Sequence, residues 1–261
     1  MSEEKTDIYR EKCFIMDMDG VIYSGDRLIP DARDFIEKLR RNGNKFLFLT
    51  NNSRQTPRDL STKLERMGIQ VAKERIFTSA IATAMFMNQQ KPKGTAYVIG
   101  DAGLYEALHG VGYQITEFNP DYVVMGETSS YSLEMIEKAI NFITAGARFL
   151  ATNPDPIGPK ELGIVPATGA LTAPIEVATG RKPYFIGKPN PLMMRTALQK
   201  LDSHSENTVM IGDRMDTDVV AGIEAGLETI LVLTGVTGRE DLKNYSYQPD
   251  RVCRSIGEVW P

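Results

Sequence analysis

The chain has 261 residues, of which 42% are hydrophobic and 25% are charged, as in ordinary folded proteins. This length suits one large domain or two smaller ones. The formal net charge is −4 and no block of like charge stands out, which argues against a nucleic-acid polymer as partner. Residues 1–11 lack the apolar core of a signal peptide, and no run approaches the ~20 apolar residues that span a bilayer. We therefore expect a soluble, cytoplasmic protein that does not enter a membrane.

Short apolar runs alternate with amphipathic stretches along the chain, which is the rhythm of βαβ units in a largely parallel sheet. Between the first two runs, Ala32, Phe35, Ile36 and Leu39 recur at helical spacing. The fold class that this pattern predicts is a doubly wound, mostly parallel α/β sheet. The runs that we expect to form buried strands are residues 13–18, 45–50, 96–99, 122–125, 148–151, 208–211 and 229–233.

The middle of the chain has strands and helices of its own, closed by a stretch rich in Pro and Gly at residues 153–169. After residue 183 the strand-and-helix pattern of the outer segments resumes. This organisation predicts a core formed by residues 1–79 and 183–261, with residues 80–182 as an inserted α/β domain. A homodimer that uses the middle region is an open alternative to a monomer.

Two acidic residues mark the end of the first predicted strand. Asp17 and Asp19 are two residues apart, so the period of a strand directs both carboxylates to one face. The carboxyl ends of strands in open parallel sheets are where ligands bind. The alternative is a plain Asp-Gly turn whose carboxylates face solvent.

Three further strand ends carry polar side chains of complementary chemistry. The run 45–50 leads into a hydroxyl and amides, the run 184–187 leads into a lysine, and the run 208–211 leads into three more carboxylates. A helix dipole could account for an acidic residue in a first turn, but not for the gathering of five carboxylates at one edge. These strand-end residues are Thr50, Asn51, Asn52, Lys188, Asp213, Asp216 and Asp218.

Carboxylates that close to one another must protonate or bind a cation, because two of them ~4 Å apart repel by ~4 kcal/mol at an effective dielectric constant near 20. Mg²⁺ prefers one or two carboxylates together with waters and a phosphate oxygen. The lysine, the hydroxyl and the backbone N–H groups are ligands for an anion. The set therefore predicts Mg²⁺ as cofactor and a phosphate group as ligand.

The four motifs, taken in order, resemble those of the haloacid dehalogenase (HAD) superfamily. They are Asp-x-Asp-Gly-Val from Asp17, Thr-Asn-Asn from Thr50, Gly-Lys-Pro around Lys188, and Gly-Asp-x-x-x-x-Asp ending at Asp218. Further stretches, among them residues 126–128, 151–155 and 180–183, resemble the NagD-like phosphatases of subfamily IIA. The resemblance covers nearly the whole chain and implies that the insertion is a C2-type cap. Residues 1–10 would be a short extra leader.

The resemblance implies a role for each residue of the motifs. Asp17 would be the nucleophile that forms an aspartyl-phosphate, and Asp19 would be the general acid and base. The metal ligands would be Asp17, the backbone carbonyl of Asp19, and Asp213. Asp218 would not contact the metal directly but would orient waters or Lys188. The phosphate would be held by Thr50, Asn51 and Lys188 and bordered by Arg214, Met215, Asp216 and Thr217. The role of Asp216, as a helix cap or a site residue, stays open.

Two other regions are expected to shape the site. Residues 21–30 are rich in turn formers, and in resembling proteins this region is a flap that shields the site together with the cap. The cap would choose the substrate, because the core recognises phosphate alone. Residues 126–128, 153–155 and 167–171 are candidate cap loops, although each could be a mere connection.

The leading functional hypothesis is a Mg²⁺-dependent phosphatase of small phosphate esters. The resemblance to NagD favours nucleoside 5′-monophosphates such as UMP or GMP, with broad specificity. Sugar phosphates, phosphoglycolate and aryl phosphates such as p-nitrophenyl phosphate are alternatives. A response-regulator receiver fits poorly, because receivers are half this length and their phospho-acceptor Asp follows the acidic pair. A non-catalytic phospho-ligand module on the same fold is a remote alternative.

Overall fold

The computed structural model describes residues 9–159 and 164–260, so that most of the expected leader, residues 1–8, lies outside the described residues. The chain divides into two compact units. Unit 1 consists of residues 1–49, 64–71 and 194–261, and unit 2 consists of residues 50–63 and 72–193. Unit 2 thus contains all of the predicted cap, residues 80–182, together with flanking segments. The predicted boundaries of the cap stay a prediction.

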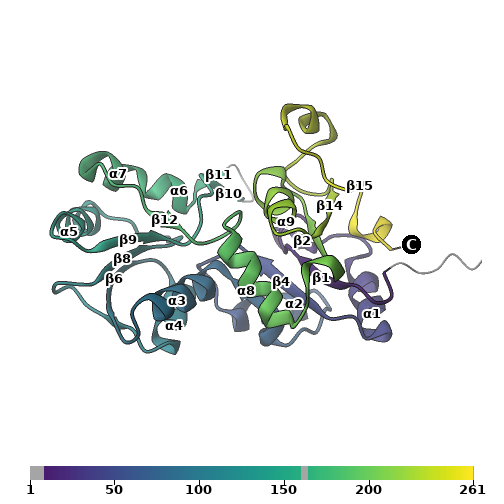
Figure 1. The fold of residues 1–261 in the computed structure, drawn as a ribbon, viewed down its shortest axis with the longest axis horizontal. Helices are drawn as coiled ribbons and strands as arrows, with labels where there is room; N and C mark the ends of the chain where they lie inside the picture. Colours follow the sequence, from purple (N-terminus) through teal and green to yellow (C-terminus); the bar gives the residue numbers. More distant parts are fainter. Residues whose placement is uncertain (1–8, 160–163, 261) are drawn as a thin grey trace, which may run out of the picture. The chain divides into compact units, whose positions relative to one another are not determined.

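Unit 1 is built on a parallel sheet whose strands follow the order β15-β14-β13-β1-β4 (Figure 1). Phe14 of β1 is in register with Val209 of β13 on one side and with Phe46 of β4 on the other. These central strands are buried because the sheet is covered, as runs of continuous apolar residues predict. The strands are β1 (Cys13–Met16), β4 (Phe46–Thr50), β13 (Thr208–Gly212), β14 (Glu228–Val232) and β15 (Arg251–Cys253).

The other elements of unit 1 are short, apart from α1 (Ala32–Asn42), which buries Ala32, Phe35, Ile36 and Leu39 as their spacing predicts. The middle of the predicted flap, residues 23–28, forms a two-stranded antiparallel ribbon of β2 (Tyr23–Ser24) and β3 (Arg27–Leu28). The remaining elements are η2 (Ser205–Asn207), the π-helix η3 (Met215–Val219), α9 (Val220–Glu224), η4 (Arg239–Asn244) and η5 (Ile256–Glu258).

Unit 2 has its own parallel sheet, of order β12-β9-β8-β6-β7 (Figure 1). Side chains alternate along its strands. Val98 and Val124 pack on α3 (Ser79–Gln90) and α4 (Ala102–Gly110). Ile99 and Val123 pack on the opposite face with α5 (Leu133–Thr144) and α7 (Ala173–Thr179). Helices on both faces are the hallmark of a doubly wound sheet. The strands are β6 (Thr95–Ile99), β7 (Gln114–Ile115), β8 (Tyr122–Met125), β9 (Arg148–Ala151) and β12 (Tyr184–Phe185).

Unit 2 also contains helices and smaller elements that are not part of this sheet. They are η1 (Lys73–Arg75), β5 (Ile76–Thr78), α3 (Ser79–Gln90), α4 (Ala102–Gly110), α5 (Leu133–Thr144), α6 (Thr168–Leu171), α7 (Ala173–Thr179) and an antiparallel pair of β10 (Ile157–Pro159) and β11 (Ile164–Pro166). Two helices, α2 (Pro57–Arg66) and α8 (Pro191–Leu201), have residues in both units.

The predicted fold class is confirmed: both units are α/β, each has a parallel sheet, and unit 2 is inserted into the sequence of unit 1. The N-terminus of α2 is capped by a reciprocal pair of hydrogen bonds: the hydroxyl of Thr56 accepts the N–H of Asp59 at 3.1 Å, and the Asp59 carboxylate accepts the N–H of Thr56 at 3.0 Å. Among the described residues, no helix combines the length and the apolarity needed to cross a bilayer.

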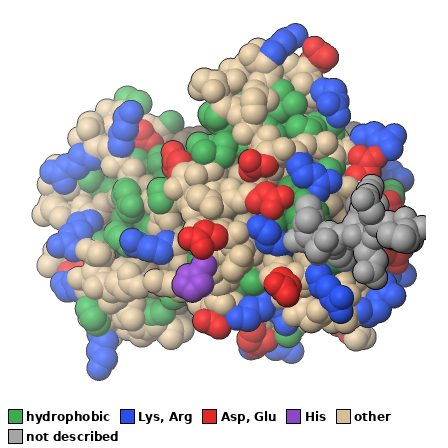
Figure 2. All heavy atoms as spheres, turned by 45° about the vertical axis from the view of Figure 1, so that its right-hand side comes forward, with side chains coloured by type: hydrophobic (Ala, Val, Ile, Leu, Met, Phe, Trp, Pro, Cys, Tyr) green, Lys and Arg blue, Asp and Glu red, His purple; other side chains and the backbone are tan. Residues whose placement is uncertain are grey.

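Acidic and basic side chains are interspersed on the face that Figure 2 shows, and neither sign dominates it. This distribution agrees with the absence of charge blocks in the sequence.

Candidate active site

Three carboxylates of unit 1 lie together at the carboxyl ends of two neighbouring strands. Asp17 follows β1, and Asp213 and Asp218 follow β13; one oxygen from each lies within 4.8 Å of those of the other two. Because β1 and β13 are parallel and in register, both strands deliver their carboxylates to the same edge. The backbone N–H of Asp17 donates to the carbonyl of Ile211 at 2.9 Å, so this residue continues the ladder.

Asp19 lies in a tight turn just before the predicted flap. The carbonyl of Met18 accepts the N–H groups of Ile22 at 2.9 Å and Tyr23 at 3.2 Å. Gly20 has a φ of +81°, a left-handed conformation that glycine adopts without strain. Burial raises the pKa of the Tyr23 phenol well above its usual range, and the negative charges of Asp19 and Asp17 raise it further. The turn therefore brings the carboxylates of Asp17 and Asp19 near one buried phenol.

The turn after β13 is held by its own acidic residue. Oδ2 of Asp218 accepts the backbone N–H groups of Asp213 and Arg214, each at 3.2 Å. Both Asp213 and Asp218 are buried. The π-helix η3 carries Asp218 back over the turn, and such helices occur frequently at functional sites. Asp218 thus positions the backbone that presents Asp213.

A loop that the sequence analysis did not single out also holds Asp213. The N–H of Val236 donates to Oδ2 of Asp213 at 2.7 Å, and the N–H of Thr237 donates to its carbonyl at 3.1 Å. At Gly235, a Cβ atom would lie 2.0 Å from Oδ2 of Asp213, so only glycine allows this approach. The signal was available, since residues 234–238 follow the predicted strand 229–233 at the same edge of the sheet.

Arg214 and Asp216 form a bidentate ion pair. Nε of Arg214 donates to Oδ1 of Asp216 at 2.9 Å, and Nη2 donates to Oδ2 at 2.8 Å. Burial acts to raise the pKa of the Asp216 carboxyl, but the hydrogen bonds and charge of Arg214 outweigh it and lower the pKa. Met215 and Thr217 are buried. Of the two roles left open for Asp216, the helix cap gains no support, because η3 has no side-chain cap hydrogen bond.

Two of the predicted phosphate-binding residues of unit 2, Asn51 and Lys188, are joined by hydrogen bonds. The amide of Asn51 accepts the N–H of Lys188 on Oδ1 at 2.8 Å and donates from Nδ2 to the carbonyl of Lys188 at 3.0 Å. The hydroxyl of Thr50 accepts the N–H of Asn52 at 3.2 Å. Lys188, which follows β12, is almost completely buried. The structure thus brings Asn51 and Lys188 together although 137 residues separate them.

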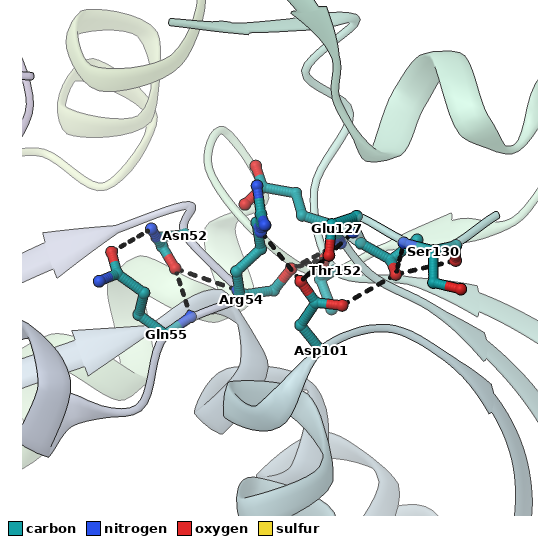
Figure 3. Close-up of polar contacts among 10 residues, drawn as sticks. Asn52, Arg54, Gln55, Asp101, Glu127, Ser130 and Thr152 are labelled. Carbon is teal, nitrogen blue, oxygen red and sulfur yellow. Dashed lines mark hydrogen bonds and ion pairs between the residues drawn. The ribbon is translucent and has the colours of Figure 1, made fainter. Parts of the chain in front are cut away.

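Unit 2 contains a second polar cluster, whose residues follow the strands β4, β6, β8 and β9 (Figure 3). Arg54 donates from Nε to the Asp101 carboxylate at 3.0 Å, and the hydroxyl of Thr128 donates to its other oxygen at 2.8 Å. The N–H of Glu127 donates to the hydroxyl of Ser53 at 2.9 Å. Burial, more than any neighbour, raises the pKa of the Glu127 carboxyl to about 7. The predicted cap loop 126–128 therefore carries an acid that can change its charge near neutral pH.

The three clustered carboxylates have the chemistry of a site for a hard cation. Two unit charges 4.8 Å apart repel by ~3 kcal/mol at an effective dielectric constant near 20. A divalent cation relieves this repulsion, and an all-oxygen donor set is what Mg²⁺ prefers. Among the described residues, Asp17, Asp213 and Asp218 are the one group of this kind. The donor set therefore fits Mg²⁺.

Comparison with known proteins identifies the family. Residues 14–114 match the family described as haloacid dehalogenase-like hydrolase, and residues 185–259 match the one described as HAD-hydrolase-like. The dihydroxyacetone phosphatase of Corynebacterium glutamicum is 52% identical over 94% of this chain and 90% of its own length. The ribonucleotide monophosphatase NagD of Escherichia coli K12 is 43% identical over 95% of this chain and 98% of its own.

Solved structures agree with these matches. NagD from E. coli K-12 superposes with a TM-score of 0.90 over 95% of this chain and 97% of its own. The 4-nitrophenylphosphatase of Thermotoga maritima, 38% identical, superposes with a TM-score of 0.92 over 97% of both chains. The resemblance noted in the motifs is thereby confirmed along almost the whole sequence. The chain belongs to the haloacid dehalogenase superfamily and is a phosphatase of its NagD-like subfamily IIA.

Proposed function

We propose that the chain is a Mg²⁺-dependent phosphatase of small phosphomonoesters that works through an aspartyl-phosphate. The observation that carries the proposal is the group formed by Asp17, Asp213 and Asp218 at the carboxyl ends of two parallel strands. In a phosphatase of this family, such a group supplies a nucleophile and a cation site at one place.

In the proposed reaction, a carboxylate oxygen of Asp17 attacks phosphorus. The new oxygen–phosphorus bond forms as the bond to the leaving alcohol breaks, and Asp19 gives that alcohol its proton. A water then attacks the phosphorus of the aspartyl-phosphate. Asp19, now ionised, takes a proton from this water, and Asp17 leaves as a carboxylate with release of inorganic phosphate. The two half-reactions balance without any further reactant.

The residues proposed to hold Mg²⁺ are Asp17, the backbone carbonyl of Asp19, and Asp213. When bound, the ion would neutralise charge between the carboxylate and the phosphoryl group. Asp218 supports the site by fixing the backbone beside Asp213, since it accepts the N–H groups of Asp213 and Arg214. The loop from Gly235 to Thr237 is a further support, because it donates to both the side chain and the backbone of Asp213.

The phosphoryl oxygens are proposed to meet the hydroxyl of Thr50, the backbone N–H of Asn51 and the ammonium of Lys188. The turn 214–217 would border the phosphate through its backbone, because the side chains of Met215 and Thr217 are buried and that of Arg214 is paired with Asp216. Asp216 would then act on the phosphate only through the orientation of Arg214.

For the substrate, we propose nucleoside 5′-monophosphates within a broad range of small phosphate esters, acting in the cytoplasm. The ribonucleotide monophosphatase at 43% identity supports this choice. Dihydroxyacetone phosphate is a second candidate, because the relative at 52% identity is named for it. Sugar phosphates and aryl phosphates stay in the range, since acid sugar phosphatases and a 4-nitrophenylphosphatase are also similar.

Phosphate release tests the proposal directly. The panel would contain UMP, GMP, dihydroxyacetone phosphate, a hexose phosphate, phosphoglycolate and p-nitrophenyl phosphate, each with Mg²⁺ and with chelator. We expect turnover that requires Mg²⁺ and is absent in Asp17→Asn, and the ranking of kcat/KM would name the substrate class. Turnover that survives in Asp17→Asn would refute the nucleophile. No release from any ester would favour a non-catalytic phospho-ligand module.

A further inference from the structure

The cap loop that contains Asn153 and Asp155 holds Asn51 from two sides. Nδ2 of Asn51 donates to Oδ2 of Asp155 at 2.8 Å, and Nδ2 of Asn153 donates to the carbonyl of Asn51 at 2.8 Å. The loop is itself braced, because the N–H of Asp155 donates to Oδ1 of Asn153 at 3.1 Å. Both side chains are buried, Asn153 completely and Asp155 with 8% exposure. Such contacts are protected from water and hold a fixed geometry.

The same amide of Asn51 is the link to Lys188. Its oxygen accepts the N–H of Lys188 and its nitrogen donates to the carbonyl of Lys188. An amide that is turned over would set its NH₂ group against the N–H of Lys188, two donors face to face. The bridge therefore exists in only one orientation of the amide.

Asp155 is the neighbour that selects this orientation. An ionised carboxylate can only accept hydrogen bonds, so it requires the NH₂ end of the Asn51 amide to point toward it. Hydrogen bonds to a charged acceptor are also about twice as strong as neutral ones. With the NH₂ end held by Asp155, the oxygen end faces the N–H of Lys188.

We propose that Asp155 is a positioning residue for phosphate binding: it orients the Asn51 amide, which in turn fixes the backbone of Lys188. This inference rests on the proposed function, in which Asn51 and Lys188 bind the phosphoryl group. The loop 153–155 would therefore contribute to phosphate binding and not to selection of the leaving group. A loop that instead selected the leaving group would affect substrates unequally.

The test compares Asp155→Ala with Asp155→Asn, because asparagine keeps a carbonyl oxygen that can accept from Asn51. Asp121→Ala is the matched control: Asp121 is an acidic residue of unit 2 that accepts the N–H of Thr95 at 2.9 Å and pairs with Lys91, and it has no part in the proposed site. Three quantities would be measured for each protein: kcat/KM for p-nitrophenyl phosphate and for UMP, inhibition by inorganic phosphate, and hydrogen exchange of the Lys188 amide.

We expect Asp155→Ala to lower kcat/KM by about 10- to 100-fold for both esters alike, since a displacement of ~1 Å costs rate on that scale. Phosphate inhibition should weaken, and the Lys188 amide should exchange faster. Asp155→Asn should recover most of the activity, and Asp121→Ala should keep kcat/KM for both esters.

Three results would overturn the inference while leaving the proposed function intact: Asp155→Ala as active as the wild type, a loss confined to one ester, or Asp155→Asn as impaired as Asp155→Ala. A wild-type protein that releases phosphate from no ester would overturn the proposed function instead, and it would be recognised before any variant is compared. Faster exchange at Lys188 without loss of activity would show that the bridge forms but is not needed, which also refutes the inference.

Discussion

A single oxygen of Asp218 accepts the backbone N–H groups of both Asp213 and Arg214, at 3.2 Å each. The side chain of a residue in η3 thus closes the turn that leads out of β13. Because the carboxylate of Asp218 also lies within 4.8 Å of those of Asp17 and Asp213, one residue serves both the turn and the acidic group. Removal of its carboxylate should therefore affect folding and metal binding together.

Asp218→Ala tests this double role. It leaves two backbone donors without their carboxylate, which typically costs about 1–3 kcal/mol for a buried group. Loss of a residue that supports a metal ligand typically weakens metal affinity by about 10- to 100-fold. Thermal unfolding and Mg²⁺ titration would measure the two effects. Asp218→Asn keeps an acceptor oxygen and should recover most of the stability; equal losses in both variants would contradict the assigned hydrogen bonds.

Asp17→Asn should abolish turnover and yet stabilise the metal-free protein. Loss of the nucleophile should reduce kcat by at least about 10³-fold, as for other covalent catalysts. Removal of one of three clustered charges relieves repulsion, so that unfolding in chelator should occur at a higher temperature than in the wild type. Melting curves with and without Mg²⁺ would show this, with a smaller gain from Mg²⁺ in the variant because it binds less tightly. A lower melting temperature in chelator would contradict the close approach of the carboxylates.

Gly235→Ala should disable the site without any change to an acidic residue. The added Cβ would lie 2.0 Å from Oδ2 of Asp213, so Asp213 or the loop must move. We expect kcat to fall by about 100-fold, the scale of a 1 Å displacement at a reacting centre. Gly110→Ala is the control, because a Cβ there meets nothing within 4 Å. Activity preserved in Gly235→Ala would show that the loop can move away at no cost to Asp213.

The strand ends could be predicted from sequence because two simple rules place them. A strand of period two directs Asp17 to the carboxyl edge of a parallel sheet, and β13 delivers Asp213 to the same edge. The family resemblance then supplied roles for Lys188 and Asn51. Each of these predictions depends only on the spacing and order of residues along the chain, which can be read directly from the sequence.

The contacts that support these residues could not be predicted in the same way. The position of residues 234–238 after a predicted strand places that loop at the right edge of the sheet, but it does not predict that Gly235 touches Asp213. The hydrogen bond from Asn51 to Asp155 joins residues 104 positions apart, and no spacing rule connects them. The pairing of Arg214 with Asp216 depends on the path of a π-helix, which departs from the usual helical periodicity. The burial of Glu127 depends on how the loops of unit 2 pack around it.

Glu127→Gln should remove a pH-dependent loss of stability. Burial raises the pKa of the Glu127 carboxyl from 4.5 to about 7, and the negative charge of Asp155 adds to this effect. Ser53, Arg54 and Asn153 act to lower the pKa, but burial outweighs them. The folded protein therefore binds this proton more tightly than the unfolded chain, and the free energy of unfolding falls as the pH rises from about 4.5 to about 7.

Above pH ~7 the ionised Glu127 should lower the free energy of unfolding by less than about 3 kcal/mol. Solvent screening reduces the cost, because the residue is partly exposed. Melting temperatures of wild type and Glu127→Gln at pH 5, 6, 7 and 8 would measure this contribution as their difference. The difference between variant and wild type should be smallest at pH 5, should grow up to about pH 7 and should level off toward pH 8, because glutamine never ionises. Glu106→Gln, at an exposed position on α4, serves as the control. A Glu127→Gln curve that runs parallel to the wild type at every pH would mean that the carboxyl is ionised throughout, held so by Arg54, and that burial does not control its charge.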